Sequence, residues 1–303
     1  MSRTGNAGEN EWGSGVDDGG RTGRGFGRIV AAGFVAVVIV AAVALFIAGR
    51  FGGDDSTDAS GDGAAGGAGG AVSSGQVAER FEWADRKADV NGQMVYKPEP
   101  RRGQILSDRV RSYPSASGPE ASSSKPQGVI FESITMDTIA PIPFSTSDGP
   151  TGFDGDVPIG YSRSAAGAAL AAGAYRAPNL FSDPSPEKAR SVLAKTTTDQ
   201  LSKFEAMQKE REQYIADEGE SKLDGFLDGH LDAPDGYIIN SYDGSYARVT
   251  IFDKALNPMP SGKTIGAAVV DLTWTDAGWK VKGFDPEPAE LDAFPEGMLS
   301  WTS

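Results

Sequence analysis

Residues 266–284 read GAAVVDLTWTDAGWKVKGF, and this stretch predicts a β-hairpin. Large apolar residues alternate with polar ones on both sides of a turn at 276–278, as expected of strands with one buried face. The alternating residues are Val270, Leu272 and Trp274 before the turn, and Trp279 and Val281 after it. Upstream, SYARVTIFDK repeats the alternation at Ala247, Val249 and Ile251, and another strand begins at Tyr237. The C-terminal part therefore predicts an antiparallel sheet of about four strands.

Helical patterns precede these strands. Ala165 to Tyr175 (AAGAALAAGAY) predicts a helix of small residues, which allow close approach to a sheet. Ser185 and Pro186 fit a helix start, and Thr197 with Gln200 fits a capping box for the next helix. One face of that helix carries Leu201, Phe204, Met207, Tyr214 and Ile215. Helices followed by antiparallel strands predict an α+β fold in which the helices cover one face of the sheet.

Ile29 to Ala48 reads IVAAGFVAVVIVAAVALFIA, a run without charge or polar face. A helix needs about 20 apolar residues to cross the hydrocarbon core. The sequence therefore predicts one transmembrane helix over 29–49. Four arginines precede it, whereas Arg50 is followed by no basic residue before Arg80. Positive charge favours the cytoplasmic side, so the N-terminus is expected inside and the C-terminal domain outside the cell membrane. A cleaved signal peptide is the alternative, disfavoured by the long N-terminal region.

The chain divides into five expected segments. A disordered cytoplasmic tail (1–28) and the transmembrane helix (29–49) come first. A flexible linker (50–127) follows, rich in Gly, Ala, Ser and Pro, with a short helix near 77–90. An extracytoplasmic domain spans 128–285, and 286–303 form a C-terminal tail.

The composition excludes several classes of function. The chain has 303 residues, 28 Lys and Arg against 42 Asp and Glu, one His and no Cys. A net charge of −14 argues against nucleic acid as a partner, because phosphate binding needs a basic face. Without Cys there are no disulfides, thiol catalysis or thiolate metal sites. One His excludes a multi-histidine metal site within one chain.

Three short motifs invite a chemical interpretation, and none supports a cofactor or metal prediction. Gly262-Lys263-Thr264 lacks the upstream glycine of a phosphate-binding loop, because Asn257 stands there. Ser185 and Lys188 match S-x-x-K without its partner motifs. The acidic loop 224–235 lacks EF-hand spacing, so solvated turn acids are favoured, although calcium binding stays open.

The order of helices and strands, closing on DLTWTDAGWKVKGF, resembles the nuclear-transport-factor-2-like fold. That resemblance implies a cone-shaped domain of N-terminal helices packed on a curved antiparallel sheet. The stretch PFSTSDGPTGFDGDVPIGYSRSAAGAALAA is similar to an uncharacterised family of single-pass membrane proteins from high-GC Gram-positive bacteria. The layout also resembles the bitopic scaffold subunits of conjugation and type IV secretion machines.

Six aromatic residues are candidates for lining a cavity in such a cone or an interaction surface, with core packing as the alternative. They are Phe204, Tyr214, Tyr237, Phe252, Trp274 and Trp279. The preferred hypothesis is a non-enzymatic, membrane-anchored scaffold or accessory protein of a transfer or secretion apparatus. It implies self-association or contacts with envelope or transfer-machine proteins. The alternative is a tethered extracytoplasmic module that binds a small apolar ligand.

Overall fold

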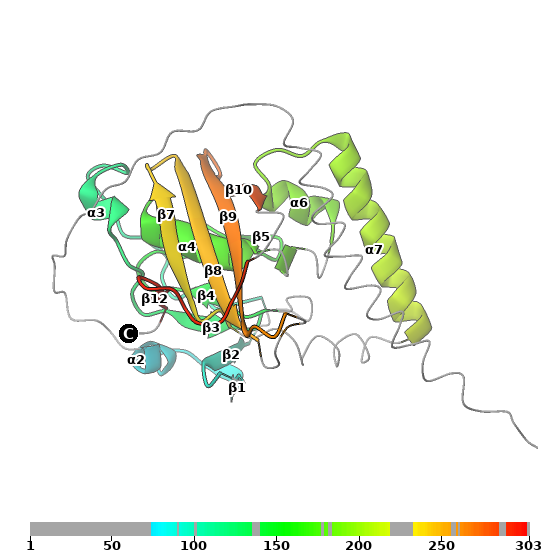
Figure 1. Ribbon diagram of the computed structural model, residues 1–303, viewed down its shortest axis with the longest axis horizontal. Coiled ribbons are helices and arrows are strands. Elements are labelled where there is room, and N and C mark those ends of the chain that lie inside the picture. The colour runs from blue at the N-terminus through cyan, green and yellow to red at the C-terminus, as the bar shows by residue number, and fades with distance from the viewer. Residues whose placement is uncertain are drawn as a thin grey trace, which may run out of the picture.

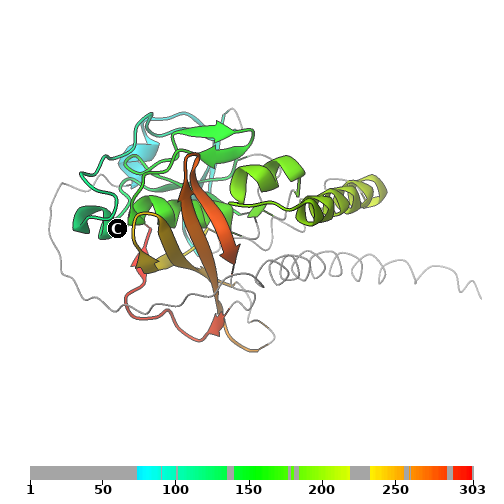
Figure 2. The same cartoon turned by 90° about the horizontal axis from the view of Figure 1, so that it is seen from above.

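The computed structural model describes residues 74–89, 91–99, 102–134, 140–176, 179–180, 184–218, 233–255, 259, 261–284 and 289–301. Within them, a buried helix lies between a large antiparallel sheet and a smaller sheet, and two further helices extend to one side (Figures 1 and 2). None of the helices in these ranges is long and apolar enough to cross a membrane. The transmembrane prediction for 29–49 and the tail prediction for 1–28 lie outside the described residues.

The large sheet contains the four strands expected from the C-terminal pattern. They are β7 (Gly236–Tyr242), β8 (Tyr246–Lys254), β9 (Ile265–Thr275) and β10 (Gly278–Phe284). Two short strands join them: β12 (Leu299–Ser300) pairs with β7, and β11 (Ala289–Leu291) pairs with β9. The spatial order is β10-β9-β8-β7-β12. The bridge between Leu193 and Val281 covers part of the outer edge of β10.

Helix α4 (Ala165–Tyr175) packs against the inner face of this sheet, and all eleven of its residues are buried. The inner face comprises Ala247, Val249, Ile251, Val270 and Leu272, which are 0 % exposed. Small side chains on α4 permit this close packing. Ser164 caps the helix by accepting a hydrogen bond from the Gly167 backbone N–H at 3.0 Å. The small-residue helix predicted for 165–175 is therefore confirmed at the predicted residues.

A second sheet packs on the other side of the core, in the order β1-β2-β3-β4. Its strands are β1 (Trp83–Ala88), β2 (Met94–Pro98), β3 (Ile130–Glu132) and β4 (Ile142–Phe144). Strands β2 and β3 are parallel, and the other neighbours are antiparallel. A separate hairpin joins β5 (Gly152–Asp154) to β6 (Val157–Ile159). Short helices α2 (Ser74–Ala78) and α3 (Pro119–Ser122) complete this region.

Helices α6 (Pro186–Val192) and α7 (Thr198–Glu218) begin as the sequence predicts. Ser185 accepts a hydrogen bond from the Lys188 N–H at 3.1 Å, with Pro186 at the first helical position. Thr197 and Gln200 form the reciprocal bonds of a capping box, at 3.2 and 2.8 Å. Helix α7 extends from α6 away from both sheets (Figures 1 and 2).

The predicted fold class is wrong. The domain is not a cone of N-terminal helices on one four-stranded sheet, because strands β1 to β6 precede α4 and form further sheets. The short helix expected near 77–90 is also incorrect: α2 ends at Ala78, and Trp83–Ala88 form a strand. This strand misleads sequence reasoning because residues 84–88 are all exposed and show no alternation.

The described parts of two segments expected to be a linker and a tail belong to the folded unit. In the described part of 50–127, β2 pairs with core strand β3, and Arg111 forms an ion pair with buried Asp148. In 286–303, Trp301 is 4 % exposed and packs between Tyr237 and Phe131, at ring-centroid distances of 4.4 and 6.2 Å. This tryptophan thus joins the large sheet to the small one. Burying an aromatic side chain of this size stabilises the fold by more than the conformational entropy that the tail loses when it is held in place.

Candidate functional site

The six aromatic residues proposed from the sequence do not line one space. Trp274 and Trp279 pack edge to face, 5.2 Å between ring centroids, at the end of the β9–β10 hairpin. Tyr237 lies in the core against Trp301, and Phe252 lies on the opposite face of the sheet with Ile265 and Ala267. Phe204 is buried near the start of α7, and Tyr214 belongs to the same helix further along.

The most densely bonded polar cluster surrounds Asp148, which is 0 % exposed. Arg111 and the Ser147 hydroxyl donate to Oδ2 at 2.7 and 2.5 Å. Three hydroxyls donate to Oδ1, and they belong to Ser162 (2.7 Å), Ser164 (3.2 Å) and Tyr113 (3.3 Å). Burial raises the pKa of Tyr113, opposed first by a hydrogen bond with Ser124. Five donors hold the Asp148 carboxylate in one position, and two of them, Ser162 and Ser164, lie just before α4. The cluster therefore fixes the start of α4.

Sequence reasoning missed this cluster, although a signal for it exists. Residues 145–148 read STSD directly before Gly149-Pro150, and Ser162 and Ser164 flank an arginine just before α4. Such residues usually indicate turns and helix caps, since their side chains bond nearby backbone groups. The serines of the two segments meet at the Asp148 carboxylate only because segment 145–148 folds against segment 162–164.

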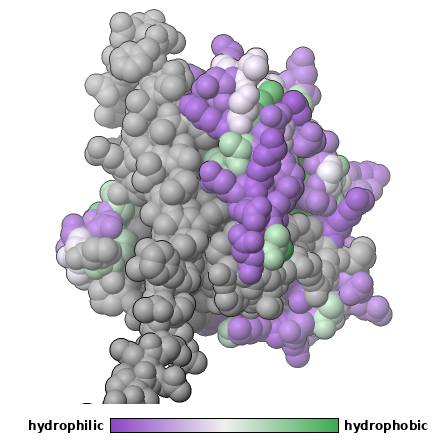
Figure 3. Space-filling view, turned by 90° about the vertical axis from the view of Figure 1, so that its right-hand side faces the viewer, coloured by the Kyte–Doolittle hydropathy of each residue, from purple (hydrophilic) through white to green (hydrophobic). Residues whose placement is uncertain are grey.

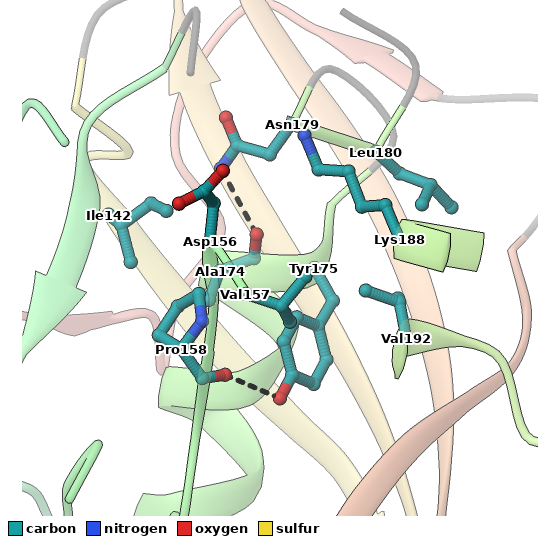
Figure 4. A pocket seen from close by; sticks show the side chains of 10 residues that line it. All are labelled: Ile142, Asp156, Val157, Pro158, Ala174, Tyr175, Asn179, Leu180, Lys188 and Val192. Atoms are coloured by element: carbon teal, nitrogen blue, oxygen red, sulfur yellow. Dashed lines mark hydrogen bonds between the residues drawn. The ribbon is translucent and has the colours of Figure 1, made fainter. Parts of the chain in front are cut away.

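A small cleft opens between the β5–β6 hairpin, the end of α4 and α6 (Figure 4). Its inner volume is about 20 Å³, roughly the space for one water molecule, and the rest of the hollow is open to solvent. Apolar groups form most of its lining, and they belong to Ile142, Val157, Pro158, Ala174, Leu180 and Val192. Asp156, Asn179 and Lys188 reach the same cleft, with Tyr175 at its base donating to the Pro158 carbonyl at 2.7 Å. An apolar lining with a few polar groups is typical of ligand sites, although the cleft in this conformation has room only for about one water molecule.

Helix α7 provides the second surface of interest. One side of the helix is buried, where Phe204 is 1 % and Met207 is 5 % exposed. The other side carries charged residues and faces solvent. Of the described helices and strands, α6 makes the main contact with it. The described residues on this side of the molecule are mostly hydrophilic (Figure 3). The helix is thus anchored at one end and presents a polar, structured surface along its length.

The motifs set aside in the sequence have structural roles or lie outside the described ranges. Gly262 is at a turn between β8 and β9 with a φ of +86°, and Lys263 donates to the Glu290 carbonyl at 2.9 Å. Of the acidic loop 224–235, the structure describes only Ala233 onward, and Asp235 accepts a hydrogen bond from the Lys254 N–H at 2.7 Å. Within the described part of the chain, no three His, Cys, Asp or Glu side chains converge as a metal site.

These features define a class of protein: a mixed α and β domain with a buried helix between two sheets, a small apolar cleft and a projecting helix. The chain belongs to the family described as Domain of unknown function (DUF8175), whose model matches residues 96–296. The comparisons with curated proteins and with solved structures each give no match. The matched region begins in β2, within the segment expected to be a linker, and therefore includes the Arg111–Asp148 pair.

Proposed function

We propose that this chain is a non-enzymatic interaction module, tethered to the membrane by residues 29–49, that acts as a scaffold or accessory subunit of an envelope assembly. A conjugative transfer or secretion apparatus is the assembly that its layout resembles. The observation that carries the proposal is α7, a 21-residue helix projecting beyond the packed core (Figures 1 and 2). At 1.5 Å per residue such a helix is about 31 Å long, far longer than the seven-residue α6 that contacts it.

The local interactions of α7 suit a rigid contact arm. Lys203 pairs with Asp199 at 2.9 Å, one turn apart. The Gln208 and Gln213 amides donate to Glu212 and Asp217, each four residues further along, at 3.3 and 2.9 Å. Exposed pairs of this spacing contribute a few tenths of a kcal/mol each, and together they favour the helical conformation of α7. A preformed helix loses less conformational entropy when it binds a partner.

Site-specific photocrosslinking in native cells tests this function. A photoreactive residue at Glu205 or Glu212, both exposed on α7, should crosslink to an identified envelope protein or to a second copy of the chain. The matched control is the same residue at Asp276, exposed in the β9–β10 turn. Equal crosslinking at all three positions, or none at the α7 positions, would overturn the proposed role of α7.

The cleft favours a second candidate, the binding of a small apolar ligand with one polar end. Its lining is mostly apolar with a few polar groups, as in many ligand pockets, but its inner volume of about 20 Å³ holds about one water molecule. A short acyl chain can therefore enter only if α6 or the β5–β6 hairpin moves. Octanoate is a suitable probe, and its binding to the full-length protein can be measured by calorimetry. Binding that is lost in Val192→Trp, which fills the cleft, and retained in Val269→Trp, on the outer sheet face, would support this candidate. Equal binding by both variants would exclude the cleft.

A further inference from the structure

The core contains a carboxyl group whose hydrogen bonding is incomplete. Glu132 ends strand β3, is 0 % exposed, and accepts the Gln104 backbone N–H on Oε2 at 2.6 Å. Its Oε1 atom has no hydrogen-bond partner among the described residues. Asp148, equally buried, accepts five hydrogen bonds from side chains. Because a buried charge needs several such donors, Glu132 with its single donor is suited to the neutral form.

The segment 102–106, here named the strap, contacts Glu132 through Gln104. The fit is close at Gly103, whose φ is +105° and where a Cβ atom would lie 2.6 Å from Cζ of Phe153 and 2.9 Å from Cγ2 of Ile134. Gln104 follows directly and supplies the one N–H that reaches the carboxyl group. Ile105 and Leu106 are partly buried against the same core. The strap is thus held on the core by apolar packing and is joined to the buried carboxyl group by a single hydrogen bond.

We infer that the strap is a pH-sensitive element, closed over Glu132 when this side chain is neutral and released when it becomes charged. In the closed state the ionised carboxylate would be held in an apolar environment with one donor. Opening the strap lets water solvate it, and the opening sacrifices only the Gln104 bond and the local apolar contacts. The open state is therefore favoured as the pH rises.

Among the described residues, the titratable side chains that face Glu132 belong to Tyr161 and Tyr96. Tyr161, 3 % exposed with its hydroxyl also unpartnered among the described residues, interacts electrostatically with Glu132 and packs against Tyr175. On the two neighbouring strands, the residues paired with Glu132 are Tyr96 on β2 and Ile142 on β4. Ile142 has no titratable group. On the strap, Arg102 pairs with Asp156 at 4.0 Å, and both side chains are more than half exposed. Burial raises the pKa of Glu132, opposed by the Gln104 N–H.

Hydrogen exchange of the purified full-length chain, followed by mass spectrometry between pH 5.5 and 8.5, tests the inference. Exchange is corrected for its intrinsic pH dependence. Protection of the peptide containing residues 104–106 should fall by up to tenfold per pH unit above about pH 4.5, the ordinary pKa of a solvated glutamate, and should level off above the raised closed-state pKa of Glu132. Protection of a peptide from β8, whose exchange needs global unfolding, should stay higher than strap protection at every pH, whereas equal protection of the two peptides would show that the strap opens only when the whole domain unfolds. In Glu132→Gln, which keeps the shape without the charge, strap protection should not change with pH.

Two other results would overturn the inference: constant strap protection in the wild-type chain, or an equal fall in Glu132→Gln. The wild-type profile is decisive even if the variant folds poorly. Gly103→Ala provides a positive control, because its Cβ atom cannot fit beneath the closed strap. This variant should show low strap protection at every pH. High protection in Gly103→Ala would contradict the closed geometry itself.

Discussion

Arg111 lies with a guanidinium nitrogen 2.7 Å from Oδ2 of Asp148, although 37 residues separate them in the chain. Asp148 is fully buried, and the side chain of Arg111 is 33 % exposed, so the pair closes over the core from outside. Through Ser162 and Ser164 the same carboxylate reaches the first turn of α4. One acidic residue therefore holds three separate stretches of chain together.

Replacing Asp148 by alanine should destabilise the domain by about 3 kcal/mol or more, since it leaves Arg111 and several hydroxyls without their acceptor. Urea unfolding followed by circular dichroism measures the change. Asp108→Ala is the matched control, because the Asp108 side chain is 88 % exposed. Its effect should stay within about 0.5 kcal/mol. If the two substitutions lowered the free energy of unfolding by the same amount, the Asp148 cluster would not be what holds the fold together.

Local rules predicted α4, the two capped helices and the four long strands, because each depends on contacts within a few residues. The capping box of Thr197 and Gln200 and the alternation around Leu272 are such local signals. The position of Asp271 on the face opposite Leu272 also follows from that alternation, and there it accepts a hydrogen bond from the Tyr246 hydroxyl at 2.6 Å.

The second sheet and the Asp148 cluster could not be predicted in the same way. The β-branched and aromatic residues at 129–134 do indicate a strand, and β3 lies there, but β4 to β6 have three residues each, too short to show a period, and lie among turn-forming residues. Strand β1 carries exposed Asp85, Arg86 and Lys87, as charged edge strands often do, and resembles a solvated helix in sequence. Trp301 acquires its role only because the chain returns between the two sheets.

Gly167→Ala offers a test in which helix propensity and packing predict opposite signs. Alanine is favoured over glycine inside a helix by about 1 kcal/mol. In α4, however, a Cβ atom at Gly167 would lie 2.0 Å from the Ser162 carbonyl oxygen, so the backbone must shift. We expect a net loss of about 1–3 kcal/mol in urea unfolding, as for overpacked cores. Gly75→Ala in α2, where a Cβ atom meets nothing within 4 Å, should be neutral or stabilising. A stabilised Gly167→Ala would contradict the packing of α4.

Glu132 should make the global stability depend on pH. Burial raises its pKa well above the ordinary value of 4.5, so the folded state binds this proton more tightly than the unfolded state does. The stability that the proton provides is complete below about pH 4.5 and declines as the pH rises toward the folded-state pKa. The urea midpoint of the wild type should therefore fall with rising pH relative to that of Glu132→Gln. A difference between the two proteins that is constant from pH 4 to 8 would exclude a raised pKa.

The indole ring of Trp279 links the β9–β10 hairpin to the residues just before α4 by a hydrogen bond that phenylalanine cannot make. Its indole N–H donates to the Ser162 carbonyl at 2.9 Å, and the ring is 2 % exposed. Trp279→Phe keeps an aromatic ring but leaves a buried carbonyl unsatisfied and removes buried volume. We expect a loss of about 2–3 kcal/mol in urea unfolding. Trp274→Phe, at a partly exposed position in the same hairpin, should cost less than about 1 kcal/mol. Equal losses would mean that ring volume alone, and not the bond to Ser162, determines the contribution of Trp279.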